Sequence, residues 1–341
     1  MSAGFVLGPP ADVTSDDSLT RRQLIAAGTS LTALWAAGCS ASEAPPDPAA
    51  TRTVTDLAGR SVTIPVNPQR IVSLDPNRIT ADLVALGFAP IGATTNPTNP
   101  DGGFAPTLGA AADGMESLGA TGEANLEQVA ARQPDLIFHA TAYQAIPVET
   151  LAAIAPVITY EYPPTGLLAP LTWLGELLGV EDRATALKTD LTTTIDQQKA
   201  AIGLTGRRVS LVNLGNYEAT TTLSLGGSGT NIGELAELLG AVVVPEDVAG
   251  KSLKGEFVDV ALELAPSTLS DTEWIIASYY GGNEDNEQRY RAATAHPVWR
   301  SVPAVKAGRV AYLNVQESYG TTGIDGIRAA LEDLASQTAS R

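Results

Sequence analysis

The stretch RIVSLDPNRITADLVALGFAPIGAT, residues 70–94, decides the fold class of this chain. It opens with the short apolar run 70–74, which is typical of a buried strand. In 78–87 the apolar residues recur every three or four positions until Gly87, as in a helix that ends at a glycine. Residues 89–94 return to a strand pattern. Strand, helix and strand in this order predict a parallel sheet with helices on its faces.

The same alternation occurs along most of the chain. Residues 53–64 alternate and break at Ala58-Gly59, which predicts a hairpin. We expect further helices at 125–133, 147–154, 231–240, 257–266 and 322–337, and further strands at 135–140, 157–161, 208–215, 241–244, 274–280 and 309–314. Residues 181–202 contain neither Gly nor Pro and predict one helix of about 33 Å, at 1.5 Å per residue. We therefore expect two Rossmann-like α/β lobes with parallel sheets, joined by a single long α-helix.

An internal repeat supports two lobes. Glu127 precedes Pro134 by the same spacing as Asp259 precedes Pro266, and each pair lies before a predicted buried strand. Ligands of open α/β sheets bind beyond the carboxyl ends of the strands. Two such lobes facing each other predict a ligand cleft between them.

The N-terminus has the features of an export signal. Arg21-Arg22 is followed by the apolar run LIAAGTSLTALWAA and then by Gly38-Cys39. The run is too short for a membrane-spanning helix, which needs about 20 residues. It predicts a signal peptide with a lipobox at Cys39, exported by the twin-arginine route or by the Sec route with a chance arginine pair.

The domain boundaries follow from these features. We expect a signal peptide at 1–38, a flexible tether at 39–52, an N-terminal lobe at 53–165, an interlobe helix region at 166–203 and a C-terminal lobe at 204–341. The tether is rich in Ala, Pro and Ser and lacks a core-facing period. The lipid on Cys39 would hold the protein at the outer face of the cell membrane.

Composition excludes one class of function. The formal net charge is -17, and no basic run exceeds two residues. A nucleic-acid binder needs Lys and Arg to neutralise phosphates, so we expect no nucleic-acid partner. The single cysteine also leaves no internal disulfide.

Signals for an enzyme are weak. GGSGT at 226–230 lacks the last glycine of a nucleophile elbow, and a Gly-rich turn before a helix explains it better. An exported enzyme would have to use His139 or His296 with Ser228. These are the only two histidines, and each lies in a different predicted lobe, which disfavours a zinc or manganese receptor. We expect no catalytic residues, no metal site and no cofactor.

Six segments resemble, in order, the class III periplasmic binding proteins, the siderophore and cobalamin receptors of ABC importers. They are VTDLAGRSVTIPVNPQRIVSLDP, DLVALGFAPIGAT, ANLEQVAARQPDLIF, LAAIAPVIT, PVWRSVPAVKAGRVAYLN and GIDGIRAALEDL. The resemblance spans nearly all of 53–337 but is poor at 94–121 and at the insertion PSTLSDTEW, residues 266–274. It implies two lobes bridged by one long helix, a shallow cleft and small closure on binding.

The resemblance also implies a function. We expect a binding lipoprotein that captures a ferric siderophore and delivers it to a permease, and that acts as a monomer. Cobalamin or haem is the alternative ligand within the family. From other classes, an exported enzyme or an adhesion or signalling lipoprotein on the same scaffold stays open.

Candidate ligand-binding residues come from two sources. Arg78 and Tyr319 align with cleft-lining loops of the family. Strand ends and the loops after them add His139, Tyr143, Asn216, Tyr217, Tyr279 and Tyr280. Aromatic faces with a few polar groups suit a flat chelate, although each tyrosine could equally be a half-buried core residue. Because cations are few in this set, we expect a neutral or weakly charged chelate rather than a catecholate.

Receptors of this family carry one acidic residue on each lobe that meets an arginine of the permease. The resemblance assigns these roles to Glu127 and Asp259, with Glu256 as the fallback in the second lobe. An acidic residue in a first helical turn is also favoured by the helix dipole alone, by about 0.3–1 kcal/mol.

Overall fold

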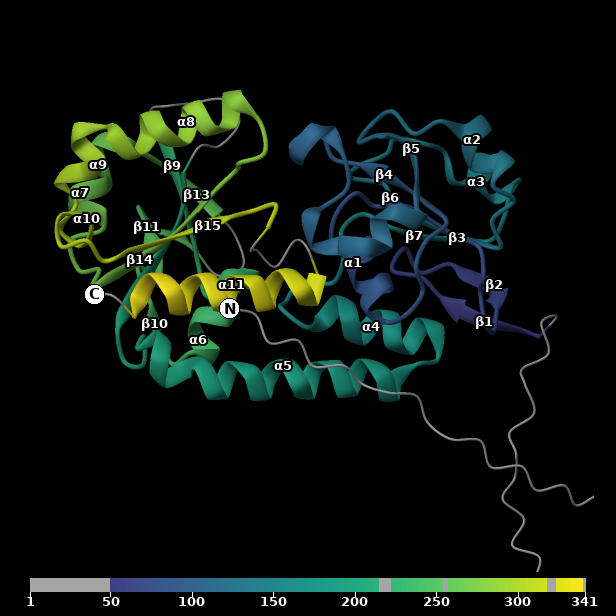
Figure 1. Ribbon diagram of the computed structural model, residues 1–341, viewed down its shortest axis with the longest axis horizontal. Helices are drawn as coiled ribbons and strands as arrows, with labels where there is room; N and C mark the ends of the chain where they lie inside the picture. The colour runs from purple at the N-terminus through teal and green to yellow at the C-terminus, as the bar shows by residue number, and fades with distance from the viewer. Residues whose placement is uncertain (1–49, 215–221, 254–256, 318–322, 340–341) are drawn as a thin grey trace, which may run out of the picture. The chain divides into compact units, whose positions relative to one another are not determined.

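The structure, a computed structural model, describes residues 50–214, 222–253, 257–317 and 323–339. These residues belong to one compact unit, residues 46–341. Figure 1 shows an α/β lobe in purple to blue, a second α/β lobe in green to yellow, and a long helix along both. In this part of the chain, no helix has the length and apolarity that a membrane span requires.

The N-terminal lobe is built on a parallel sheet. Its strands are β3 (Ile71–Leu74), β4 (Gly92–Thr95), β5 (Glu116–Ala120), β6 (Leu136–Ala140) and β7 (Val157–Tyr160). Their spatial order is β5-β4-β3-β6-β7, and every pairing is parallel. All residues of β3, β6 and β7 are buried, which is why these strands read as continuous apolar runs. The β-α-β expectation from 70–94 is confirmed.

The remaining elements of this lobe connect or flank the sheet. They are the strands β1 (Thr51–Thr55) and β2 (Ser61–Pro65), the helices α1 (Arg78–Ala85), α2 (Leu126–Ala131) and α3 (Val148–Ala152), and the 3-10 segments η1 (Pro100–Gly102) and η2 (Pro106–Gly114). The predicted hairpin is β1-β2. The buried carboxylate of Asp56 closes its turn by accepting from the Ala58 and Arg60 amides, and it also accepts from the Thr159 amide on β7.

Two helices join the lobes. The predicted long helix is α5 (Glu181–Ile202). A separate helix that was not predicted, α4 (Ala169–Leu178), lies in the same interlobe region and packs against it. Gly175 allows this close approach, since a Cβ there would stand 2.6 Å from the Cβ of Ala184. The buried side of α5 is formed by Ala184, Leu191, Ile195 and Ile202.

The C-terminal lobe has a mixed sheet, not the parallel one expected. Its strands are β8 (Arg208–Leu214), β9 (Thr222–Gly226), β10 (Val242–Val243), β13 (Phe257–Ala261), β14 (Trp274–Tyr279) and β15 (Val310–Asn314). The order is β13-β9-β8-β14-β15, with β10 beside β8. Strand β9 runs antiparallel to both β8 and β13, whereas β10, β14 and β15 are parallel to their neighbours.

The helix predicted at 257–266 is wrong. Residues 257–261 form the edge strand β13, because Phe257, Val258 and Val260 favour the extended chain and pair with β9. Only after this strand does the chain turn into η3 (Leu262–Leu264) and α7 (Ala265–Thr268). Pro266 therefore lies in the first turn of a helix, not at the end of one.

The other elements of this lobe are helices and one small hairpin. They are α6 (Asn231–Leu238), α8 (Glu284–Ala295), α9 (Pro297–Ser301), α10 (Pro303–Lys306), α11 (Gly323–Thr338) and the hairpin β11-β12 (Asp247–Val248, Lys251–Ser252). Helix α11 contacts α1 of the other lobe and lies beside α5 (Figure 1). Its first turn is held by Asp82 of α1, whose Oδ1 accepts from the Ile324 amide at 3.0 Å.

Candidate functional site

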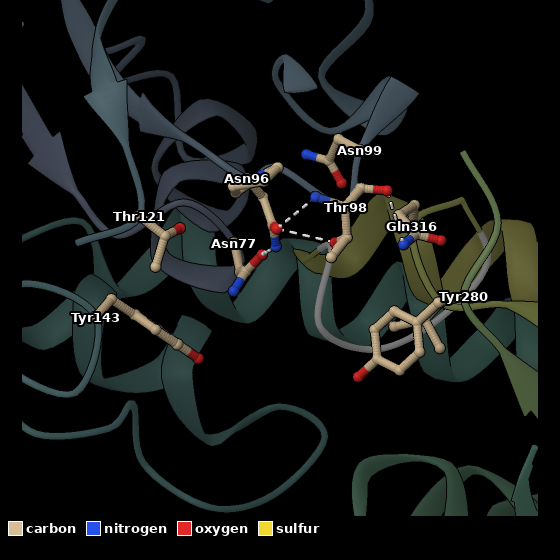
Figure 2. A pocket seen from close by; sticks show the side chains of 10 residues that line it. Asn77, Asn96, Thr98, Asn99, Thr121, Tyr143, Tyr280 and Gln316 are labelled. Carbon is tan, nitrogen blue, oxygen red and sulfur yellow. Dashed lines mark hydrogen bonds between the residues drawn. The ribbon is translucent and has the colours of Figure 1, made fainter. Parts of the chain in front are cut away.

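A cavity of about 560 Å³ lies where strand ends of the two lobes meet. Its lining is formed by Asn77, Asn96, Pro97, Thr98, Asn99, Thr121, Tyr143, Tyr280, Val315 and Gln316. In Figure 2 the rings of Tyr143 and Tyr280 face the cavity from opposite sides, and the carboxamides gather between them. The volume falls in the range of small-molecule sites, about 300–1,000 Å³.

The sheet topology explains why these residues line the cavity. Asn77, Asn96 and Thr121 follow the carboxyl ends of β3, β4 and β5. Tyr143 follows β6, and on the other lobe Tyr280 follows β14 directly. Carboxyl ends of parallel strands meet at one edge of a sheet, where the connecting loops form ligand sites.

Hydrogen bonds fix the orientation of the amides (Figure 2). The Asn96 Nδ2 donates to Asn77 Oδ1 at 3.0 Å, and the Thr98 hydroxyl donates to Asn96 Oδ1 at 2.8 Å. Nearby, Asn99 Nδ2 donates to the Gly103 carbonyl at 3.1 Å. A preorganised set of donors and acceptors loses little freedom when a polar ligand binds.

Gln316 of the C-terminal lobe forms a hydrogen bond to the N-terminal lobe at the edge of the cavity. Its Nε2 donates to the Thr98 carbonyl at 3.1 Å, and its Oε1 accepts from the Gly281 amide at 2.9 Å. The side chain is only 3% exposed, so both bonds are shielded from solvent. This is a direct polar contact between the lobes at the edge of the cavity.

The cavity lining is electrically neutral. Its described residues are carboxamides, hydroxyls, a proline and a valine, without any Lys, Arg, His, Asp or Glu. Such a site suits a polar ligand with no net charge, because a strongly anionic ligand would lose its hydration without gaining a counter-charge.

An acidic group lies beneath this wall. Asp75 is fully buried, and its carboxylate accepts from the Asn77 amide at 2.8 Å and from the Tyr160 hydroxyl at 3.0 Å. Burial raises the pKa of Asp75 to about 6 despite these hydrogen bonds. The pKa of Tyr160 is raised well above its usual value, mainly by burial and then by Asp75. Asp75 therefore holds Asn77 in place without contacting the cavity.

Arg78 lines a neighbouring cavity but brings no free charge to it. Its side chain is 5% exposed, and its Nε donates to Asp82 at 2.6 Å. Its guanidinium also donates to the Leu167 carbonyl at 2.6 Å. The structure therefore makes Arg78 a buried ion-pair partner, which is consistent with a ligand that needs no cation.

His139 lies in the core of the N-terminal lobe. It is fully buried, with Nδ1 at 2.9 Å from the Thr159 hydroxyl and Nε2 at 3.0 Å from the Gln144 carbonyl. Desolvation lowers its pKa. Both ring nitrogens are therefore engaged inside the lobe, and His139 does not line the cavity.

Tyr279 points away from the cavity. Its ring stacks on Tyr290 of α8 with centroids 4.1 Å apart, and Tyr290 in turn meets Tyr312 edge-on. It is the half-buried packing aromatic that the sequence left open as an alternative. The other predicted residues, Asn216, Tyr217 and Tyr319, lie outside the described residues, as do Cys39 and Glu256.

The candidate catalytic residues are not brought together. His139 has both nitrogens engaged, and His296 Nδ1 accepts from the Val298 amide as the N-cap of α9. Ser228 lies on the wall of a separate cavity beside α6. Within the described residues, no cluster of three or more His, Cys, Asp or Glu could hold a metal ion.

Most of the amides that line the cavity were not among the predicted ligand-binding residues. Asn96, Thr98, Asn99 and Thr121 fall in 94–121, where the family resemblance is poorest, and they are neither aromatic nor charged. A stricter use of the strand-end rule would have found Asn96 and Thr121, since each follows the last residue of its strand. Gln316 is the second residue after β15, behind Val315.

The two predicted docking acids occupy unlike places. Glu127 is exposed in the first turn of α2, whose N-cap Asn125 accepts from the Glu127 and Gln128 amides. Asp259 is exposed on the edge strand β13, where it accepts from the Ser224 hydroxyl. The residue at the place of Glu127 is Glu263, in the first turn of η3 and also exposed. Asn125-Leu126-Glu127 and Ala261-Leu262-Glu263 each open the short helical segment before a central strand.

Comparisons with known proteins agree with this architecture. The model of the periplasmic binding protein family matches residues 71–316. The probable siderophore-binding lipoprotein YfiY of Bacillus subtilis is 27% identical over 292 residues, covering 83% of this chain and 86% of the relative. A periplasmic solute binding protein from Mycobacterium smegmatis has a TM-score of 0.68 at 19% identity, covering 85% of this chain and 98% of its own. FhuD of Vibrio cholerae bound to Fe3+-Desferal has a TM-score of 0.61 at 20% identity, covering 80% and 98%.

Proposed function

The chain belongs to the periplasmic binding protein family, and we propose that it captures a ferric siderophore outside the membrane and delivers it to an ABC importer. Members of this family bind substrates and do not transform them. The relative YfiY is named as siderophore-binding, and the solved Vibrio cholerae structure holds an iron chelate. This function also fits a chain whose candidate nucleophile, Ser228, has no histidine partner among the described contacts.

The observation that carries the ligand class is the neutral lining of the cavity. Three hydroxamate groups balance the charge of Fe³⁺, whereas three catecholates leave a strongly anionic complex. Carboxamides and hydroxyls can bind the polar face of a neutral chelate, and the rings of Tyr143 and Tyr280 can pack on its flat edges. The proposed ligand is therefore a ferric trihydroxamate or a chelate of similar charge.

Titration of tryptophan fluorescence tests this function. We expect a ferric trihydroxamate to bind with a single saturable transition and its iron-free form to bind at least about tenfold more weakly. Cobalamin and haem serve as the alternative ligands of the family. Saturable binding of cobalamin or haem, without binding of any ferric chelate, would contradict the proposal.

We assign the attachment to the membrane to Cys39. The sequence around it resembles a lipobox, and the relative YfiY is named a lipoprotein. Several acyl chains hold a protein firmly at a bilayer, whereas one chain binds only marginally. Cys39→Ala should therefore move the protein from the detergent phase to the aqueous phase on phase partitioning. Equal partitioning of the variant and the parent would refute the anchor.

The proposed docking residues are Glu127 and Glu263. Both are exposed acids in the first turn of a short helical segment, and the segments occupy equivalent places before β6 and β14. One such acid on each lobe can pair with one basic residue on each half of a permease. We propose Glu263 in place of Asp259 as the partner of Glu127, because Asp259 lies on a strand and accepts a hydrogen bond from the Ser224 hydroxyl.

A further inference from the structure

A second cavity adjoins the neutral one. It measures about 270 Å³ and shares Asn77 and Tyr143 with the first cavity, so the two open onto the same pair of side chains. Its other lining residues are Arg78, Pro163, Pro164, Thr165, Pro170, Gly229, Thr230, Asn231 and Phe257. The first cavity is lined mainly by amides and hydroxyls, whereas the lining of this one includes three prolines and the Phe257 ring beside its polar residues.

Several polar groups of this second cavity are already bonded to the protein. The Arg78 guanidinium is paired with Asp82 and the Leu167 carbonyl. The Thr230 hydroxyl donates to the Gly227 carbonyl at 2.8 Å and accepts from the Gly233 amide at 3.2 Å, as the N-cap of α6. Prolines offer no backbone N–H. Much of the surface left for a ligand is therefore apolar.

Phe257 is placed to cover an occupant. Its side chain is 43% exposed at the start of β13, although it is a large apolar residue. The ring rests on Gly226 of β9, where a Cβ would stand 2.8 Å from it, so a glycine is needed beneath the ring. Near the other side, the exposed Tyr162 meets Tyr143 edge-on with centroids 6.3 Å apart. Exposed aromatic side chains beside a cavity are typical of a surface that a ligand covers.

We infer that the second cavity binds a short apolar arm of the siderophore, so that the ligand is an amphiphilic ferric hydroxamate whose chelate core occupies the first cavity. This inference rests on the proposed function and adds the chemical class of the ligand's periphery. The arm enters between Asn77 and Tyr143, packs on Pro163, Pro164 and Pro170, and is covered by Phe257. Its burial favours binding in proportion to the apolar area removed from water.

The test uses two iron complexes that differ only in this arm. N-acetyl and N-hexanoyl derivatives of Desferal carry the same chelate and the same charge, and differ by four methylenes. A fully buried methylene strengthens binding about fourfold. We expect the protein to bind the hexanoyl complex at least about tenfold more tightly than the acetyl complex in a calorimetric titration.

Two variants locate the arm, and a third serves as their control. Phe257→Ala removes the cover and Thr165→Trp fills the cavity from an exposed position, so each should lower the hexanoyl-to-acetyl affinity ratio toward one. Leu238→Ala removes a similarly exposed apolar side chain of α6 away from both cavities and should keep the ratio. Thermal melting checks that each variant is folded.

The outcomes separate the inference from the proposed function. A ratio near one in the parent protein, with good binding of the acetyl complex, would overturn the arm and leave the function standing. A ratio that survives both Phe257→Ala and Thr165→Trp would place the arm elsewhere and also overturn the inference. If neither complex binds, the proposed ligand class fails and the inference fails with it.

Discussion

The two lobes share a plan but differ in the strand that precedes one short helical segment. The N-terminal lobe passes from the edge strand β5 into α2 through Asn125-Leu126-Glu127, whereas the C-terminal lobe first forms β13 and then η3 through Ala261-Leu262-Glu263. The acid-to-proline spacing is equal in both lobes, yet Glu127 lies on a helix and Asp259 on a strand. Equal spacing along a chain therefore does not mean an equal place in the fold.

The lobes also contribute unequally to the site. The described wall of the neutral cavity takes Asn77, Asn96, Thr98, Asn99, Thr121 and Tyr143 from the N-terminal lobe, but only Tyr280, Val315 and Gln316 from the other. The second cavity is shared more evenly, through the loop after β7 and the turn before α6. In the proposed complex the N-terminal lobe thus provides most of the contacts to the chelate, and the C-terminal lobe provides the proposed cover, Phe257.

The largest effect should come from reversing the charge of the equivalent acids. Glu127→Lys with Glu263→Lys should abolish uptake while ligand affinity stays within about twofold, because loss of a docking charge pair costs about 2–5 kcal/mol. The matched control is Glu149→Lys with Glu284→Lys, which reverses two exposed first-turn acids on α3 and α8. Reconstituted transporter supplies the measurement, as ligand-stimulated ATPase activity.

A third double variant decides between the two candidates in the C-terminal lobe. Glu127→Lys with Asp259→Lys should lose only the part of the ligand-stimulated ATPase activity that depends on Glu127. If this variant were as inactive as the first, and Glu263→Lys alone had no effect, Asp259 would be the docking residue after all.

The next largest effect concerns the ion pair that anchors α1 between the lobes. Arg78→Ala leaves Asp82 buried without its partner and should lower the free energy of unfolding by about 3–5 kcal/mol. Arg328→Ala is the control, since it also bridges two helices, to Asp190, but is partly exposed and should cost less than about 1 kcal/mol. Urea unfolding measures both. Equal losses of unfolding free energy in the two variants would show that the buried Arg78–Asp82 pair stabilises the fold no more than an exposed pair does.

The pH dependence of stability should reveal Asp75. Its pKa is raised from 3.8 to about 6, so the folded state holds a proton that the unfolded state releases between these values. Stability should therefore fall as the pH rises from about 4 to about 6, by about 3 kcal/mol for a shift of this size. Asp75→Asn should remove this fall, whereas the exposed Asp271→Asn should keep it. Parallel pH profiles for the parent protein and Asp75→Asn would contradict the assignment.

The smallest effect should come from the polar contact between the walls. Gln316→Ala removes the bond to the Thr98 carbonyl and should weaken binding of the chelate by about 1 kcal/mol, roughly fivefold. Gln337→Ala is the control, because Gln337 makes a similar pair of bonds to Tyr312 within one lobe. Its affinity should match that of the parent. Titration of the same ferric hydroxamate compares the two variants.

Most strands and helices of this fold could be predicted from the sequence, because local composition specifies them. The buried strands β3, β6 and β7 are continuous apolar runs, and α5 is a long stretch without Gly or Pro. The prediction from sequence was wrong at 257–266, where the apolar residues fit the period of a helix as well as that of a strand. Pairing with β9, a long-range contact, selects the strand.

The site was predicted less well than the fold. Tyr143 and Tyr280 were found because they are aromatic and follow strands, whereas His139 and Tyr279 are aromatic but lie within the last two residues of β6 and β14 and point elsewhere. Which way a side chain points near a strand end depends on packing partners such as Thr159 and Tyr290. The amides of 94–121 carry no distinctive pattern in the sequence, since their role comes from the hydrogen bonds among Asn77, Asn96 and Thr98.

The central claim is that a neutral cleft selects a neutral iron chelate, and one affinity ratio tests it most directly. The measurement compares the dissociation constants of a ferric trihydroxamate and a ferric triscatecholate for the same protein, in the same buffer. We predict that the trihydroxamate binds at least about tenfold more tightly, because the described wall offers no free cation to the anionic complex. Equal or tighter binding of the triscatecholate would contradict this account of the site.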